Sequence, residues 1–130
     1  SNRNKTKAGS RHYIHASDVA DGCLFLIKNR NKIVKKIKND YGGAKCPKFN
    51  LVGPVELDNL KLAKLIAKSV GKKLRYKMVD FHSSRPGHDL RYALDGTLMK
   101  RLGWKPNVSI EKRIDQVVNW TLKNKRWLKL

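Results

Sequence analysis

The residues with the clearest chemical potential lie around a Pro-Gly turn in the segment 84–95, Ser-Arg-Pro-Gly-His-Asp-Leu-Arg-Tyr-Ala-Leu-Asp. Pro86 fixes its own φ, and Gly87 can adopt the positive φ that the third residue of a type II turn requires. Such a turn would place Arg85 and His88 on one rim, where a planar guanidinium can bind a phosphate or diphosphate through paired hydrogen bonds. The segment is therefore a candidate anion-binding site. The competing interpretation is an ordinary surface turn in which arginine and aspartate pair with each other.

The charge of the whole chain is strongly positive. Among 130 residues, 30 are Lys or Arg and 10 are Asp or Glu, which gives a formal net charge of +20. A positive field of this size attracts polyanions of any kind, so we expect nonspecific polyanion binding, and the charge fits a nucleotide diphosphate equally well. A basic nucleic-acid-binding module stays open as an alternative, with stacking aromatics at Tyr13, Phe49, Tyr76 and Trp104. Their periodic positions favour ordinary core packing over a stacking platform.

A metal site is a third hypothesis. Its candidate ligands are His12, His15, His82, His88 and Asp89. His12 and His15 are three residues apart on an expected strand, hence on opposite faces, which disfavours joint ligation of one ion. We therefore expect no metal site.

The two cysteines and the hydropathy pattern bear on the compartment. Cys23 and Cys46 have no metal-ligand spacing, and Cys23 lies in an apolar helical run in which we expect a buried thiol. Neither residue indicates an oxidising compartment. No apolar stretch approaches the roughly 20 residues of a membrane span, and the first ten residues are polar rather than a signal peptide. We expect a cytoplasmic protein that does not contact a membrane.

The hydrophobic pattern predicts an α/β fold, helix-rich with few short strands. Residues 1–10 are an expected flexible, polar lead-in. The expected strands are 11–15, 48–52 and 74–79. The expected helices are 19–28, 29–38, 59–70, a short helix between Asp95 and Gly103, and a last helix after Ser109. Asp18, Asp58, Asp95 and Ser109 are the expected N-caps. Strands separated by a helix suggest a right-handed crossover between parallel strands. The first helix and the strand at Phe49 are too apolar for a free-standing domain, which indicates that a partner element is missing.

Four stretches carry a resemblance to a known family. They are Arg-Pro-Gly-His-Asp-Leu-Arg-Tyr-Ala-Leu-Asp at 85–95 followed by Leu-Gly-Trp-Lys-Pro at 102–106, the segment 11–20, the segment 49–59, and the tail from Gly103 to Trp120. Together they resemble the C-terminal signature of nucleotide-sugar 4,6-dehydratases. Those enzymes belong to the NAD-dependent epimerase/dehydratase family of extended short-chain dehydrogenases/reductases. The resemblance runs in register from about Arg11 to Trp127.

The resemblance implies both an architecture and a site. In this family an N-terminal Rossmann domain binds NAD, and a smaller C-terminal lobe binds the nucleotide sugar. Residues 11–130 then correspond to that lobe, with the last elements of the Rossmann sheet, and the NAD-binding domain is absent from this chain. By position, Arg11 matches the arginine that contacts the substrate phosphates, and Asn59 the asparagine at the start of a helix near the nucleotide. Arg85 and His88 match the arginine and histidine that close over the nucleotide.

The catalytic elements of the family are missing from this sequence. There is no Gly-x-x-Gly-x-x-Gly fingerprint. Tyr41 and Lys45 have the Tyr-x-x-x-Lys spacing, but they lie across Gly42-Gly43 and lack the rest of the active-site helix. The Thr-Asp-Glu segment for water elimination is also missing. We therefore expect no catalytic and no NAD-binding residues here, although the parent enzyme would use NAD and, as family members do, dimerise through Rossmann helices.

The substrate preference stays open at this point. The family's Trp-Leu after Arg11 and the next residue is here Tyr13-Ile14, and its second glycine before the glutamate is Pro54. These departures leave dTDP-, UDP- and GDP-linked hexoses as candidates. They also leave a related epimerase or decarboxylase as an alternative to a dehydratase.

Overall fold

The structure of the chain is a computed structural model that describes residues 1, 3–38, 47–80, 83, 86–87 and 89–128. Its elements in chain order are β1 (Ser10–His12), α1 (Ala16–Lys28), α2 (Arg30–Ile37), β2 (Glu56–Asp58), α3 (Asn59–Val70), β3 (Arg91–Tyr92), α5 (Thr97–Leu102), α6 (Ile110–Lys123) and the 3-10 helix η1 (Lys125–Leu128). The predicted fold class is confirmed, because the chain is α/β and helix-rich, with a small mixed sheet.

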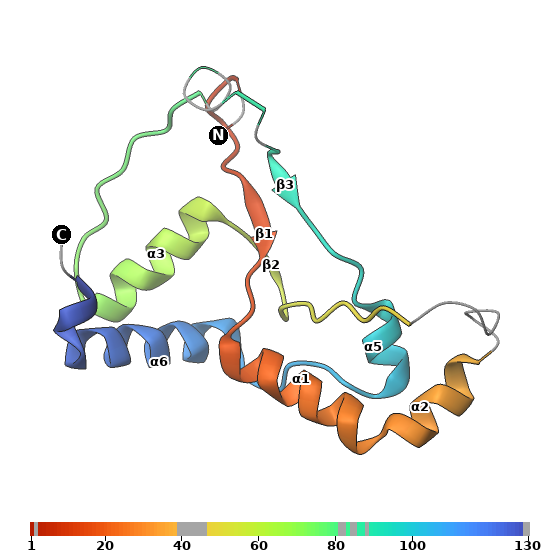
Figure 1. Cartoon of the computed structure of the whole chain (residues 1–130). Coiled ribbons are helices and arrows are strands. Elements are labelled where there is room, and N and C mark those ends of the chain that lie inside the picture. The colour runs from red at the N-terminus through yellow and green to blue at the C-terminus, as the bar shows by residue number, and fades with distance from the viewer. Residues whose placement is uncertain (2, 39–46, 81–82, 84–85, 88, 129–130) are drawn as a thin grey trace.

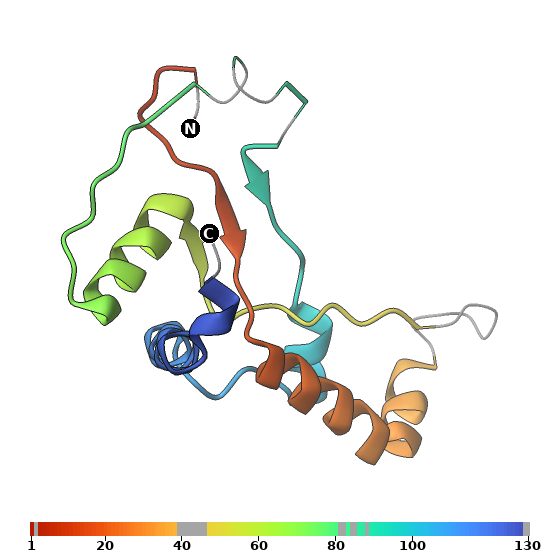
Figure 2. The same ribbon diagram turned by 60° about the vertical axis from the view of Figure 1, so that its left-hand side comes forward.

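The sheet is built around β1. The strand order is β2-β1-β3, with β1 antiparallel to β2 and parallel to β3. In Figure 1, α3 and α6 lie to the left of β1, and α1, α2 and α5 lie below it and to its right; the turned view in Figure 2 shows β1 between β2 and β3. The predicted parallel crossover between the first two strands is wrong, because β1 and β2 run in opposite directions. The parallel pair is instead formed by β1 and β3, which are far apart in the sequence.

Two of the three predicted strands do not form. The first is confirmed in shortened form as β1, but residues 48–52 and 74–79 carry no strand. Both segments have the apolar alternation of a strand, yet a strand exists only where a neighbour supplies hydrogen bonds. Among the described residues, no strand pairs with either segment. β2 and β3 form in their place, each too short to leave a periodic signal.

The helix ends follow local capping chemistry in most places. The Asp58 carboxylate accepts a hydrogen bond from the Lys61 amide, and Gly71 ends α3 in the left-handed conformation, both as predicted. Ser109 caps α6 through the Lys112 amide, also as predicted. Asp95 was predicted as the N-cap of α5, but the N-cap is the next residue, Gly96, because α5 starts at Thr97. The Asp95 carboxylate still accepts a hydrogen bond from the Thr97 amide at 2.9 Å.

The start of α1 differs from the prediction. His15 is the N-cap, and its Nδ1 accepts a hydrogen bond from the Ser17 amide at 3.0 Å. Asp18 lies instead inside the first turn, where its side chain is 3% exposed and pairs with Arg113 of α6, which is 14% exposed. Arg113 donates from Nε to Asp18 Oδ2 at 3.0 Å and from Nη2 to Oδ1 at 2.5 Å. This bidentate pair joins α1 to α6.

The apolar core lies between α3 and α6. Ile110, Ile114 and Val118 of α6 are buried, and Tyr13, Leu57, Leu62 and Leu65 pack against them. The turned view in Figure 2 shows α6 end-on directly beneath α3. Since α3 begins where β2 ends, this packing also fixes the position of the sheet.

A second buried region lies beneath α1. Trp104 is 5% exposed, and its Nε1 donates to Asp21 Oδ2 at 2.8 Å. A Cβ at Gly22 would lie 2.7 Å from Leu51 and 3.0 Å from Trp104, so glycine allows this close approach. The burial of Trp104 confirms the packing interpretation for this aromatic, whereas Tyr76, at 57% exposed, was expected to be core-like and is not.

Other apolar residues of α1 are on the surface. Leu24 is 53% and Ile27 is 60% exposed. The prediction of a buried Cys23 thiol is wrong, because that residue is exposed as well. Several apolar side chains of α1 are therefore not buried by the described residues. Among the described residues, no helix has the length and apolarity needed to cross a membrane.

Replacing Asp18 by Ala tests the link between α1 and α6. The change should lower the free energy of unfolding by about 3 kcal/mol, because it leaves the nearly buried Arg113 guanidinium without its counter-charge. Lys61→Met, which removes an ion pair whose lysine is 69% exposed, is the matched control and should cost less than about 1 kcal/mol. Urea unfolding followed by tryptophan fluorescence measures both. Equal losses in the two variants would contradict the structural role of the pair.

Candidate anion-binding site

Arg11 lies in the central strand and is held there by its neighbour in β3. Side chains alternate along a strand, so Arg11 faces away from Ser10 and His12. In the parallel register Arg11 is opposite Tyr92. The Arg11 Cζ atom lies over the Tyr92 ring, 4.9 Å from its centroid, which is within cation–π range.

Asn59, the first residue of α3, meets Arg11 on the same face. Its Oδ1 accepts a hydrogen bond from Arg11 Nη1 at 3.2 Å and another from the Tyr13 hydroxyl at 2.5 Å. Because both neighbours donate to the oxygen, the group that the Asn59 amide can offer to a ligand is its NH₂. The structure thus brings together two of the four predicted site residues, 48 positions apart in the sequence.

Two backbone N–H groups at the start of α3 are already hydrogen-bonded within the protein. The Asn59 amide N–H already donates to the Gly9 carbonyl at 2.8 Å, and the Lys61 amide donates to the Asp58 carboxylate at 2.7 Å. These N–H groups are used within the protein. The side chains of Arg11 and Asn59 are the donors at this position that we consider available to a ligand.

The opposite face of the sheet carries an ion pair that spans all three strands. Arg91 of β3 donates from Nε to Glu56 Oε1 at 2.7 Å and from Nη2 to Oε2 at 2.8 Å. Ser10 of β1, which lies between them in the sheet, donates from Oγ to Glu56 Oε1 at 2.6 Å. These contacts lower the pKa of Glu56 to about 2, first through Arg91 and then through Ser10, and the same pair raises the pKa of Arg91.

The Pro-Gly turn leads directly into this arrangement. Gly87 has a φ of 82°, as predicted for a turn that needs the left-handed region. A few residues after the turn, the Leu90 carbonyl accepts a hydrogen bond from the Ser10 amide at 2.9 Å, so Leu90 lies beside the start of β1. Arg85 and His88 themselves lie outside the described residues, so their predicted roles stay predictions.

Of the two carboxylates in the segment 84–95, Asp95 has a different partner from the one that the competing interpretation assumed. Asp95 accepts hydrogen bonds from the Thr97 amide and hydroxyl, which lower its pKa, and Arg91 pairs with Glu56 across the sheet. For Arg91 and Asp95, the ordinary surface turn with internal Arg–Asp pairing is therefore not what the structure contains.

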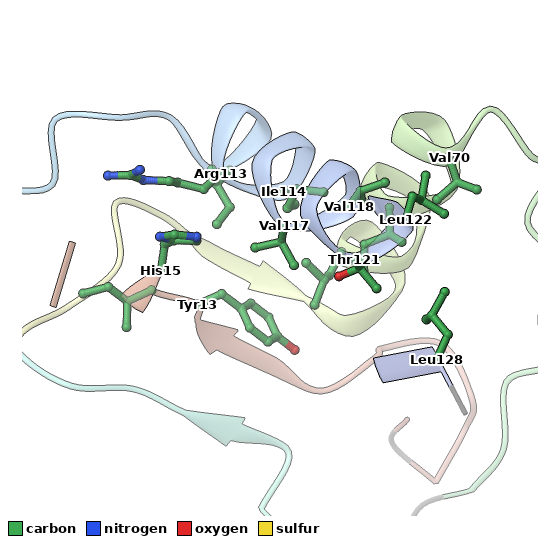
Figure 3. A pocket seen from close by; sticks show the side chains of 14 residues that line it. Tyr13, His15, Val70, Arg113, Ile114, Val117, Val118, Thr121, Leu122 and Leu128 are labelled. Atoms are coloured by element: carbon green, nitrogen blue, oxygen red, sulfur yellow. The ribbon is translucent and has the colours of Figure 1, made fainter. Parts of the chain in front are cut away.

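Two hollows lie near the sheet, and they differ in chemistry. The first is an apolar groove of about 400 Å³ between residues 13–15, α3 and α6, with His15 and Arg113 at one end (Figure 3). The second, of about 370 Å³, mixes polar and apolar walls and includes His12, Asn50 and Lys100. The Nδ1 atom of His12 is buried and has no hydrogen-bond partner among the described residues. Arg11 and Asn59 line neither of these two hollows; Asn59 is exposed and Arg11 is half-buried.

The predicted absence of a metal site can be examined in part. Within the described ranges, no group of three or more His, Cys, Asp or Glu side chains is arranged to hold a metal ion. His12 and His15 line different hollows, and His15 is engaged as a helix cap. His82 and His88 are outside the described residues.

Comparison with curated proteins relates this geometry to an enzyme family. The chain is 34% identical over 89 residues to a dTDP-glucose 4,6-dehydratase of Escherichia coli and 38% identical over 87 residues to one of Streptomyces niveus. These matches cover 61% and 66% of this chain, and the chain spans about a quarter of the length of each relative, 25% in both cases. No protein-family model matches the chain.

A solved structure shows the same fold. The chain superposes on the dTDP-glucose 4,6-dehydratase of Bacillus anthracis, solved in complex with NAD, with a TM-score of 0.66 at 21% identity, covering 94% of this chain and 34% of that one. The resemblance predicted from the sequence is thus confirmed. The chain is similar to a C-terminal part of the nucleotide-sugar 4,6-dehydratases, and in particular of dTDP-glucose 4,6-dehydratases.

Among the described residues, the turns that join a strand to a helix lack the form that NAD binding requires. Dinucleotide binding requires a glycine-rich turn between a strand and a helix, which lets the backbone approach the pyrophosphate. Among the described residues, the turn from β1 to α1 has no glycine, and β2 continues into α3 without a connection. The turn from β3 to α5 has Gly96, but a Cβ there would lie 3.1 Å from Val52, so protein already fills that space.

Sequence reasoning missed the two tyrosines of the site. Tyr13 packs against the core as expected, but it is only half-buried and its hydroxyl also contacts Asn59, which was not predicted. Tyr92 stood in the quoted motif without a role, and it lies under Arg11. Strand alternation places Arg11 and Tyr13 on one face and could have indicated the first contact. The second depends on the pairing of β1 with β3, which has no local signal.

The Glu56–Arg91 pair makes stability depend on acid pH. The folded pKa of Glu56, about 2, lies below its ordinary value of 4.5, so the pair stabilises the fold above that ordinary value and the contribution disappears as pH falls toward 2. Glu56→Gln should be less stable than the wild type at neutral pH, and the difference should narrow as pH falls through this window. Urea unfolding at a series of pH values measures it.

Arg91→Gln is the partner variant for this experiment. It removes the main cause of the lowered pKa of Glu56, so its stability difference from the wild type should narrow over the same pH range. If the free energies of unfolding of the wild type and the two variants change in parallel from neutral to acid pH, the ion pair contributes nothing to folding.

Proposed function

We propose that the chain binds the diphosphate of a nucleotide sugar, a dTDP- or UDP-hexose, as the substrate lobe of a nucleotide-sugar 4,6-dehydratase. The observation that carries the proposal is the contact between Arg11 and Asn59, which puts a guanidinium and an amide donor side by side. Similarity to dTDP-glucose 4,6-dehydratases supports the nucleotide sugar as the ligand class. A related epimerase or decarboxylase would use the same lobe and is the alternative.

The electrostatics of the sheet favour an anion at Arg11. Of the two carboxylates in β2, Glu56 is neutralised by Arg91 on the other face and Asp58 pairs with Lys61. Among the described residues, the partners of Arg11 are an amide oxygen and an aromatic ring rather than a carboxylate. A guanidinium without a counter-charge attracts a diphosphate, and the net charge of +20 increases the local concentration of such anions.

The four predicted substrate residues would then act together. Arg11 and Asn59 donate to the diphosphate from the sheet and the start of α3, and Arg85 and His88 close over it from the turn before β3. The chain itself supplies no dehydration chemistry in this proposal. Hydride transfer by NAD and the acid-base steps belong to the N-terminal Rossmann domain, which is the partner that this lobe requires, and the assembled enzyme would be a homodimer.

Isothermal titration with dTDP and UDP tests the proposal. The wild-type chain should bind both, and inorganic pyrophosphate more weakly. Arg11→Ala should weaken dTDP binding by about 10- to 100-fold, because it removes a charge-assisted hydrogen bond. Arg85→Ala should have a similar effect.

Arg75→Ala is the matched control, because it removes the same charge from an exposed position after α3. It should change the affinity by less than about twofold at physiological salt. Absence of dTDP and UDP binding at millimolar concentration would contradict the proposed function. Equal losses in Arg11→Ala and Arg75→Ala would instead indicate nonspecific attraction to a basic protein.

A further inference from the structure

We propose that Tyr92 is a positioning residue that holds the Arg11 guanidinium in place for the ligand. The inference rests on the proposed function and concerns how the site achieves its affinity. Its basis is the position of the Arg11 Cζ atom, 4.9 Å from the centroid of the Tyr92 ring.

Arg11 benefits from such support because it is only half-buried and its hydrogen bond to Asn59 is exposed. An arginine side chain has many rotamers, and ordering them for a ligand costs conformational entropy. The single hydrogen bond from Nη1 to Asn59 fixes one end of the guanidinium. The Tyr92 ring restrains its plane, so that the remaining N–H groups keep a fixed direction. A planar guanidinium that is already oriented loses less conformational entropy when it binds an anion.

The choice of an aromatic ring suits an anion site. A carboxylate at position 92 would hold Arg11 equally well, but it would neutralise the charge that attracts a diphosphate. The face of an aromatic ring attracts a cation through its quadrupole and carries no net charge. Tyr92 therefore restrains Arg11 and leaves its full positive charge for the ligand.

The strand register delivers Tyr92 to this position. Arg11 is opposite Tyr92 in the β1–β3 pair, and the preceding pair is Ser10 with Arg91. Arg91 is itself fixed to Glu56 on the other face. Because Tyr92 follows Arg91 directly, the ion pair on one face sets the location of the ring on the other.

The test compares Tyr92→Phe with Tyr92→Leu by titration with dTDP and with inorganic pyrophosphate. Phe keeps the aromatic face and should bind within about twofold of the wild type. Leu removes it and should bind about two- to fivefold more weakly, as expected for an exposed cation–π contact. In an Arg11→Ala background, Tyr92→Leu should cause no additional loss, because Tyr92 acts through Arg11. Tyr76→Leu, at another exposed tyrosine, should leave the affinity unchanged.

A ligand-free measurement separates the possible failures. The Arg11 side-chain NMR signals should show a ring-current shift in the wild type and in Tyr92→Phe, and lose it in Tyr92→Leu. Equal affinity of Tyr92→Leu and the wild type, or equal loss in Phe and Leu, would overturn the inference. If the ring-current shift is present and the wild type binds neither dTDP nor pyrophosphate, the proposed function fails, and the binding role of Tyr92 fails with it.

Discussion

The bidentate ion pair between Glu56 and Arg91 is the interaction on which the rest of the site depends. β2 has three residues and β3 has two, so their ladders with β1 give little stability by themselves. Arg91 reaches past Ser10 of the central strand to the carboxylate of β2, and one side-chain contact thereby spans the sheet. A slip of one residue would move every side chain to the other face. Fixing the register in this way keeps Tyr92 beside Arg11.

The two faces of the sheet carry two arginines with opposite electrostatic roles. Arg91 is paired with a carboxylate and contributes to the fold, whereas Arg11 contacts neutral groups and keeps its charge. In the proposed function, this separation would let a chain with a net charge of +20 hold one defined anion site at Arg11. The apolar residues that remain exposed on α1 are consistent with a lobe that packs against another domain.

Structural features that depend on neighbouring residues could be predicted from the sequence, whereas features that depend on distant residues could not. Asp58 and Ser109 were correctly predicted as helix caps, because a cap is made with an amide three residues away. The strand predicted at residues 48–52 failed, since pairing depends on a distant neighbour that the local pattern does not encode. Asp18 has the residue type of a cap, but a buried arginine 95 positions later decides its role. Arg11 and Asn59 were proposed as site residues only through resemblance to a family, because no local pattern indicates that they meet. Tyr92 was not proposed, because its contact with Arg11 depends on the pairing of β1 with β3.

A crystal structure of the chain with bound dTDP would test the central claim most directly. The account predicts diphosphate oxygens within hydrogen-bond distance, about 2.7–3.2 Å, of the Arg11 guanidinium and the Asn59 amide nitrogen. It also predicts that the Tyr92 ring still lies under Arg11 in the complex. A diphosphate bound elsewhere, with neither Arg11 nor Asn59 in contact, would contradict the account.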